Sequence, residues 1–200
     1  MTMDFDTLEI ETPGGPRTAL VITPVEDVVV SPRRYSPDSA AMSESDQRIL
    51  EGARDARSAS ASVCIFRARA PVGGGAYRFE QTMSDAEAVS TALTMLDGQL
   101  RVYREMLRLG ICLFLHTDMD PVAVHGFRGA VDVRVEELEP LTFGVGPDAK
   151  KAQLDLWLLR NLNFFFSLAF EKLIATILPD KLILMEKRME RIRRLAHEVE

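Results

Sequence analysis

One of the densest runs of large apolar side chains in the chain lies in residues 156–178, "LWLLRNLNFFFSLAFEKLIATIL", which contain three consecutive phenylalanines. Such a stretch must be buried against a bilayer, the protein's own core or another chain, because its exposure to water is unfavourable. A bilayer span needs about 20 mostly apolar residues without charge. Only ten uncharged residues separate Arg160 from Glu171, and two of them are asparagines. The sequence therefore predicts no membrane span.

Polar residues recur every three or four positions in this stretch, which predicts one long helix over residues 150–178. They are Arg160, Asn163, Ser167 and Glu171. Nearly all other positions are apolar, so the helix must be covered around most of its circumference. The rest of a 200-residue chain is expected to cover one apolar face. We expect a second chain to cover the other.

A second amphipathic helix is predicted after Pro179, which disfavours helical geometry at Leu178. Apolar residues then follow at alternating spacings of three and four, a heptad seam that fits either a coiled coil or a helix docked on the body. We predict a partner interface made of the large apolar residues of both helices: Trp157, Leu162, Phe164, Phe165, Phe166, Phe170, Leu182, Met185, Met189 and Ile192.

Charge and composition limit the kinds of partner. The net charge is −6, which argues against non-specific binding to nucleic acid and against adhesion to anionic membranes. The acidic N-terminal residues lack the apolar segment of a secretory signal, so a cytoplasmic or assembly-bound location is expected. Lysine is absent before Lys150. This shift suggests a boundary between a mixed α/β body, residues 1–149, and a helical arm, residues 150–200.

The body is predicted to belong to the α+β class, with antiparallel β hairpins and short strands around one central helix. Residues 5–23 predict a hairpin around a Pro-Gly-Gly-Pro turn. A short strand over 25–30 precedes a Ser/Pro-rich loop near 31–46, and a weakly amphipathic helix follows at 43–57. Residues 62–81 predict a second hairpin, which turns at the glycines 73–75.

The central helix is predicted over residues 84–110. Ser84 and Glu87 form a capping box at its start, and Gly110 suits its end. One face carries apolar residues at alternating spacings of three and four: Leu93, Leu96, Leu100, Tyr103 and Leu107. The apolar run 111–116 predicts a strand buried on both faces. Alternation over 130–140 predicts a half-buried antiparallel strand, and 141–146 another short strand.

The best candidate for chemistry is the "HTDMD" sequence after the buried strand, which contains His116, Asp118 and Asp120. If the strand continues, all three side chains point to one face and could bind Zn²⁺, Mn²⁺ or Fe²⁺. The alternative is a polar turn, because aspartate favours turns and Pro121 follows. No second motif with ligand spacing accompanies these residues, and no cofactor is indicated.

The other candidate sites have simpler structural interpretations. Cys64 and Cys112 lie in apolar runs, which predicts buried, reduced thiols, and a nucleophilic role would need a positioned base. The pair Arg33 and Arg34 suits either a regulated docking segment or a solvated loop. The acidic run 136–139 suits a solvated strand end.

These observations favour a non-enzymatic structural or adaptor subunit that self-associates or docks into a larger protein assembly through residues 150–200. A virion, phage-tail or secretion-machine component would fit. The alternative is a metal-dependent enzyme with a site at His116, Asp118 and Asp120.

Overall fold

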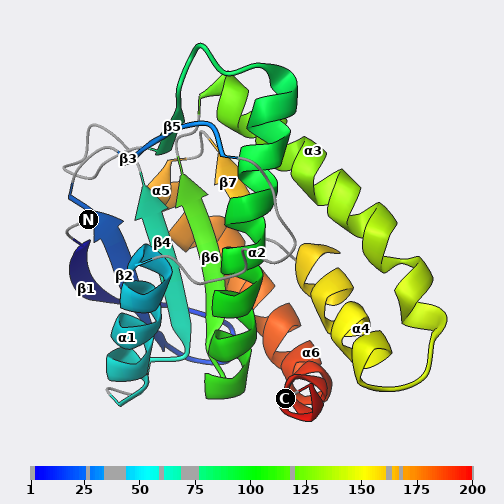
Figure 1. The fold of residues 1–200 in the computed structure, drawn as a ribbon. Coiled ribbons are helices and arrows are strands. Elements are labelled where there is room, and N and C mark those ends of the chain that lie inside the picture. The colour runs from blue at the N-terminus through cyan, green and yellow to red at the C-terminus, as the bar shows by residue number, and fades with distance from the viewer. Residues whose placement is uncertain are drawn as a thin grey trace.

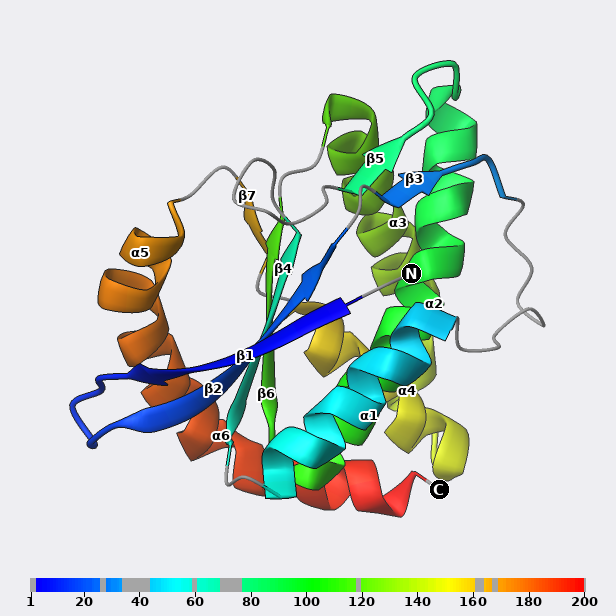
Figure 2. The same ribbon diagram turned by 90° about the vertical axis from the view of Figure 1, so that its left-hand side faces the viewer.

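A computed structural model describes residues 3–25, 28–33, 44–58, 61–68, 77–117, 120–160, 164–166 and 169–199. Its centre is a five-stranded mixed sheet with the strand order β1-β2-β4-β6-β7. Helices cover both faces of this sheet, as the edge-on view in Figure 2 shows. The combination of a mixed sheet and six helices confirms the predicted α+β class.

The first predicted hairpin is confirmed. Strand β1 (Met3–Ile10) pairs antiparallel with β2 (Arg17–Pro24), in a register that sets Ile10 opposite Arg17. Gly15 has a φ of 96°, a conformation that glycine adopts without strain. Its N–H donates a hydrogen bond to the Thr12 carbonyl oxygen at 2.9 Å, which closes the turn.

The second predicted hairpin is wrong. Strand β4 (Val63–Ala68) lies between β2 and β6 (Cys112–Thr117) and is parallel to both. Strand β5 (Tyr77–Phe79) instead pairs in parallel with β3 (Val28–Val30), in a separate two-stranded sheet. Three successive residues of β4 are buried, which is typical of a central parallel strand: Val63, Cys64 and Ile65. The expected glycine turn, residues 73–75, lies outside the described residues.

Two hydrophobic cores lie on opposite faces of the sheet. The first is formed with α1 (Glu44–Ser58), α2 (Asp85–Leu109), α3 (Pro121–Leu138) and α4 (Pro147–Arg160). The second is formed with a continuous helical segment made of α5 (Phe170–Lys172), the π-helical turn η2 (Leu173–Ile177) and α6 (Leu178–Glu198). These helices lie on opposite sides of the sheet in Figure 2.

The central helix and the buried strand agree with the sequence analysis. The capping box at Ser84 is formed, and Gly110 adopts the left-handed conformation at the end of α2. All five residues of the predicted apolar face are buried. Strand β6 is covered on both sides, since Leu113 belongs to the first core and Phe114 to the second.

The strand predicted over residues 130–140 is wrong, because these residues form most of α3. Asp120 caps this helix by accepting a hydrogen bond from the Ala123 N–H at 2.8 Å, and Pro121 occupies its first turn. The buried positions follow helical spacing: Ala123, Gly126, Phe127 and Ala130. The short strand expected over 141–146 is also absent. Those residues form a 3-10 turn, η1 (Pro140–Phe143), and the start of the loop that leads to α4.

The long helix predicted over 150–178 is interrupted. Helix α4 ends at Arg160, and β7 (Phe164–Phe166) pairs in parallel with β6. A second helical segment begins at Phe170. The three phenylalanines thus provide the backbone of an edge strand, whereas the sequence pattern had placed them on a helix.

Pro179 does not end the last helix. The helical backbone runs from Phe170 to Glu198, and η2 directly precedes Pro179. A proline lacks an N–H, and its ring clashes with a carbonyl group one turn earlier in a regular α-helix. The wider π-helical turn changes the hydrogen-bond spacing at this point, so the helix continues past the proline.

The heptad seam faces the protein's own interior. Leu182 and Met185 are buried in the second core, while Ala196 is buried in the first. Met189 packs against both cores, and Ile192 packs against the first. Strand β7 and helix α6 therefore pack on the body. The division into a body of 1–149 and an arm of 150–200 stays a prediction.

Close packing of α3 on α2 predicts that Gly126 tolerates no side chain. A Cβ atom added at Gly126 would lie 2.6 Å from the backbone oxygen of Ala88. We expect Gly126→Ala to lower the free energy of unfolding by about 1–3 kcal/mol, because the backbone of α2 has to move. Denaturant unfolding measures this change. Gly14→Ala is the control, since its added Cβ meets only flexible side-chain atoms, at 3.4 Å or more. Equal stability of both variants would contradict this account.

Candidate functional site

The fold gives the residues of the "HTDMD" sequence separate surroundings. His116 is buried, and its ring centroid lies 5.3 Å from that of Phe170 in α5. Asp120 instead caps α3, and its second carboxylate oxygen accepts a hydrogen bond from the Phe79 N–H at 2.8 Å. Asp118 lies outside the described residues. Within the described part of the chain, no group of three or more His, Cys, Asp or Glu residues could hold a metal ion.

Both cysteines are buried, free thiols. Burial raises the pKa of Cys64 to about 12. The pKa of Cys112 also rises to about 12, through burial and then through the negative charge of Glu186. Because the thiolate is the reactive form, neither residue is activated as a nucleophile. The Sγ atom of Cys112 instead lies 3.1 Å from the Sδ atom of Met189.

Arg33 contributes backbone contacts at the edge of the body. Its N–H donates a hydrogen bond to Thr91 Oγ1 at 2.9 Å, and its carbonyl oxygen accepts one from the same hydroxyl at 3.3 Å. Arg34 lies outside the described residues. The docking role suggested for this pair therefore stays a prediction.

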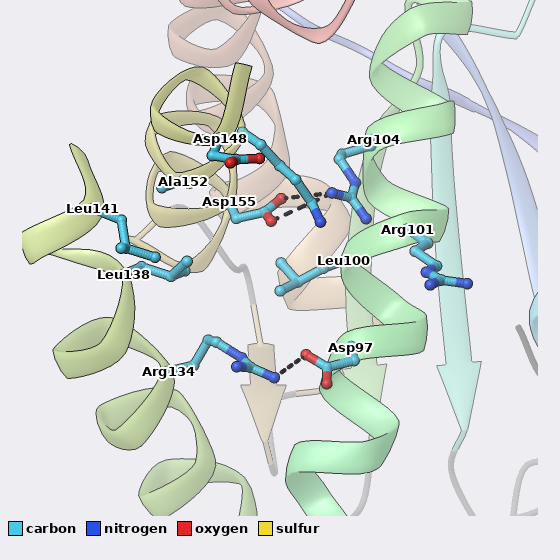
Figure 3. Close-up of a pocket in the computed structure, with 11 residues that line it drawn as sticks. Asp97, Leu100, Arg101, Arg104, Arg134, Leu138, Leu141, Asp148, Ala152 and Asp155 are labelled. Carbon is cyan, nitrogen blue, oxygen red and sulfur yellow. Dashed lines mark hydrogen bonds and ion pairs between the residues drawn. The ribbon is translucent and has the colours of Figure 1, made fainter. Parts of the chain in front are cut away.

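A charged cleft of about 400 Å³ lies between α2, α3 and α4 (Figure 3). Asp155 and Arg104 point toward each other across it, with a shortest nitrogen–oxygen distance of 3.3 Å. Below them in the view, Arg134 and Asp97 form a second ion pair between α3 and α2. The two ion pairs link α3 and α4 to α2, and the apolar stripes of these helices do not predict them.

The pKa of the Asp155 carboxyl group lies above its ordinary value. Burial raises its pKa, and the charge of Asp97 adds to the rise. The positive charges of Arg104, Lys151 and Arg134 oppose this effect. Four basic and three acidic side chains line the cleft, a balance of +1. Since its charges are mostly paired with one another, the arrangement suits a structural tie between helices better than a ligand site.

A larger groove of about 790 Å³ runs between α4 and α6, which lie side by side in Figure 1. We refer to it as the α4–α6 groove. Trp157, Ile192 and Leu195 supply its apolar lining. The polar lining consists of Gln153, Lys187, Arg188, Arg194 and Glu198. A Trp surrounded by exposed basic side chains is typical of surfaces that bind proteins.

An exposed apolar loop leads from α3 into α4. We refer to residues 141–145 as the apolar loop. Leu141 is 54% exposed, Phe143 89% and Val145 fully so. Gln153 Nε2 donates a hydrogen bond to the Thr142 carbonyl oxygen at 3.1 Å, which holds the loop beside the groove. Sequence analysis had assigned this segment to a strand, although the turn residues Pro140, Gly146 and Pro147 flank it and Gly144 lies within it.

Six of the predicted interface residues have side chains that the structure describes, and four of these contribute to the interior of the protein. Phe170, Leu182 and Met185 are buried in the second core. Met189 packs against both cores. Trp157 and Ile192 are partly buried and also line the α4–α6 groove. Leu162 lies outside the described residues, as do the side chains of Phe164, Phe165 and Phe166.

Comparison of the chain with protein-family models, with curated proteins and with solved structures finds no match. The helices in the described part of the chain are also too short or too polar to cross a membrane.

The raised pKa of Asp155 predicts a pH-dependent contribution to stability. The folded state holds this proton more tightly than the unfolded chain does. The contribution of Asp155 to the free energy of unfolding is therefore full below its ordinary pKa of 3.8. It is lost as the pH rises through the higher pKa that this carboxyl group has in the folded state. We expect the free energy of unfolding of the wild type, minus that of Asp155→Asn, to fall with rising pH above 3.8. Denaturant unfolding over a pH series measures the difference. A difference that does not change with pH would refute the assignment.

The raised pKa values of Cys64 and Cys112 predict slow reaction with thiol reagents. At pH 8 the native protein should be labelled far more slowly than the guanidinium-unfolded chain, because burial keeps both thiols protonated. Absorbance of the released chromophore, followed over time, gives both rates. Rapid labelling of one thiol in the native protein would show that this residue is accessible and ionised.

Proposed function

We propose that this chain is a non-enzymatic structural or adaptor subunit that self-associates, or docks into a larger protein assembly, through its C-terminal helices. The partner is another protein, and the setting is the cytoplasm or the assembly itself. The observation that carries the proposal is the α4–α6 groove, because it presents apolar and basic side chains of these helices on the outside of the molecule.

The groove has the chemistry of a protein-binding surface. Trp157 packs against both hydrophobic cores, which holds its ring in place while part of it lines the groove. A rigid aromatic side chain loses little conformational entropy on binding, and buried Trp and Arg residues often dominate binding energy. Lys187 and Arg188 are exposed at the same site, and among the described residues neither forms an ion pair. A carboxylate of a partner can meet them without displacing an ion pair to any described side chain.

The charged cleft supports the proposal less well. Its two most buried carboxylates, Asp97 and Asp155, each already face an arginine. A ligand there would have to replace these contacts. Two cations of α4 outside the groove lining, Lys150 and Arg160, are likewise paired, with Glu198 and Glu139. Lys187 and Arg188 are therefore the positions to test.

Charge reversal in the groove tests the proposal. Multi-angle light scattering of the wild-type chain should give a mass above the 22.3 kDa of a monomer, and the mass should rise with concentration. We expect Lys187→Glu/Arg188→Glu to return the mass to 22.3 kDa, because two carboxylates then replace the cations at the interface. Arg128→Glu, on the exposed side of α3, is the matched control. A multimer that tolerates the double reversal would show that the groove is not its interface.

A further inference from the structure

We infer that the α4–α6 groove accepts the apolar loop, residues 141–145, of a second copy of this chain. This inference rests on the proposed function and names the occupant of the groove. The loop and the groove must be complementary in charge and both apolar at their centre. They must also be placed so that each copy can insert its loop into the groove of the other.

The loop region and the groove carry opposite charges. Residues 136–148, which contain the apolar loop, carry four carboxylates and no basic residue: Glu136, Glu137, Glu139 and Asp148. Arg134 pairs with Glu137 and Arg160 with Glu139, which leaves Glu136 and Asp148 as exposed carboxylates without an ion pair among the described residues. The groove carries three basic residues, Lys187, Arg188 and Arg194, against the single carboxylate of Glu198. That carboxylate already accepts a hydrogen bond from Lys150 Nζ at 2.7 Å. An acidic loop and a basic groove attract each other and disfavour wrong alignments.

The loop and the groove both present apolar side chains to solvent. Phe143 is 89% exposed and Val145 fully so, and Leu141 of the same loop is 54% exposed, so the loop presents several large apolar side chains together, as interaction sites often do. The groove presents Trp157, Ile192 and Leu195, three apolar side chains that are only partly buried. Burial of the loop side chains on these residues removes both apolar surfaces from water.

The loop does not cover the groove of its own chain. Gln153 holds the Thr142 carbonyl oxygen, and Gly144 lies against Ala149 on the adjacent turn of α4. These contacts fix the loop beside the groove while Phe143 and Val145 point into solvent. A second molecule must therefore supply the loop that enters the groove.

The placement of both surfaces on α4 allows a closed dimer. Gln153 borders the loop, and Trp157, one turn further along the same side of α4, lines the groove. A two-fold axis can then set each loop on the partner's groove, so that one dimer contains two identical contacts. Such an isologous arrangement uses both surfaces fully and leaves none exposed for further growth.

Mixing of complementary variants tests this dimer. The loop variant is Phe143→Ser/Val145→Ser, and the groove variant is Lys187→Glu/Arg188→Glu. Each changes exposed positions, so circular dichroism should show that both remain folded. Sedimentation velocity over a concentration series should give each variant alone a dissociation constant at least about tenfold above that of the wild type. An equimolar mixture should dimerise more tightly than either variant alone, because one contact per mixed dimer keeps both native surfaces.

The outcomes separate this inference from the proposed function. If the groove variant dissociates but the loop variant remains a wild-type dimer, the groove is an interface and the loop is not its occupant. If both variants dissociate and the mixture recovers nothing, the loop and groove do not meet, and the inference is wrong. If the groove variant keeps the wild-type mass, both the inference and the proposed function fail. Arg128→Glu again serves as the control and should match the wild type.

Discussion

The burial of strand β6 on both faces is the constraint on which the rest of the structure depends. Leu113 requires one apolar layer, and Cys112 and Phe114 require another on the opposite side. Its neighbours β4 and β7 are both parallel to it, so each connection must cross over the sheet. Helix α2 provides part of the first layer, and the continuous segment from α5 to α6 provides the second. The apolar C-terminal stretch is thus needed first for the chain's own core.

Local signals in the sequence predicted individual elements well. The helix over 84–110 was predictable because its two ends carry capping residues and its apolar face follows one period. The hairpin of β1 and β2 was predictable because its turn needs glycine in one particular conformation. The placement of β4 and β5 in different sheets was not predictable, because a Gly-rich connection in the sequence resembles a hairpin turn whichever sheets the flanking strands join.

Residues 130–140 and the candidate sites show why other parts of the structure could not be predicted from the sequence. Alternating valines fit a strand, but they also fit the side of a helix that packs only partly, and Val131, Val133 and Val135 are all partly buried in α3. The Asp-Pro pair at 120–121 signalled the helix start and was interpreted as a turn. Residues close in sequence, such as His116 and Asp120, lie in different environments in the fold. The ion pair of Arg104 and Asp155 joins residues 51 positions apart, and no spacing rule predicts such a pair.

The two edges of the sheet explain how the chain could associate without forming fibres. The β1 edge carries Asp4, Asp6 and Glu9 as exposed acidic residues, and in the described part of the chain the β7 edge has three strand residues. A second strand that approached β1 from an identical chain would bring like charges together, and β7 offers little backbone for pairing. Growth by strand addition is therefore disfavoured at both edges. In the proposed dimer the contacts between copies involve side chains on helices and loops, which can be replaced one at a time without altering the hydrogen bonds of the sheet.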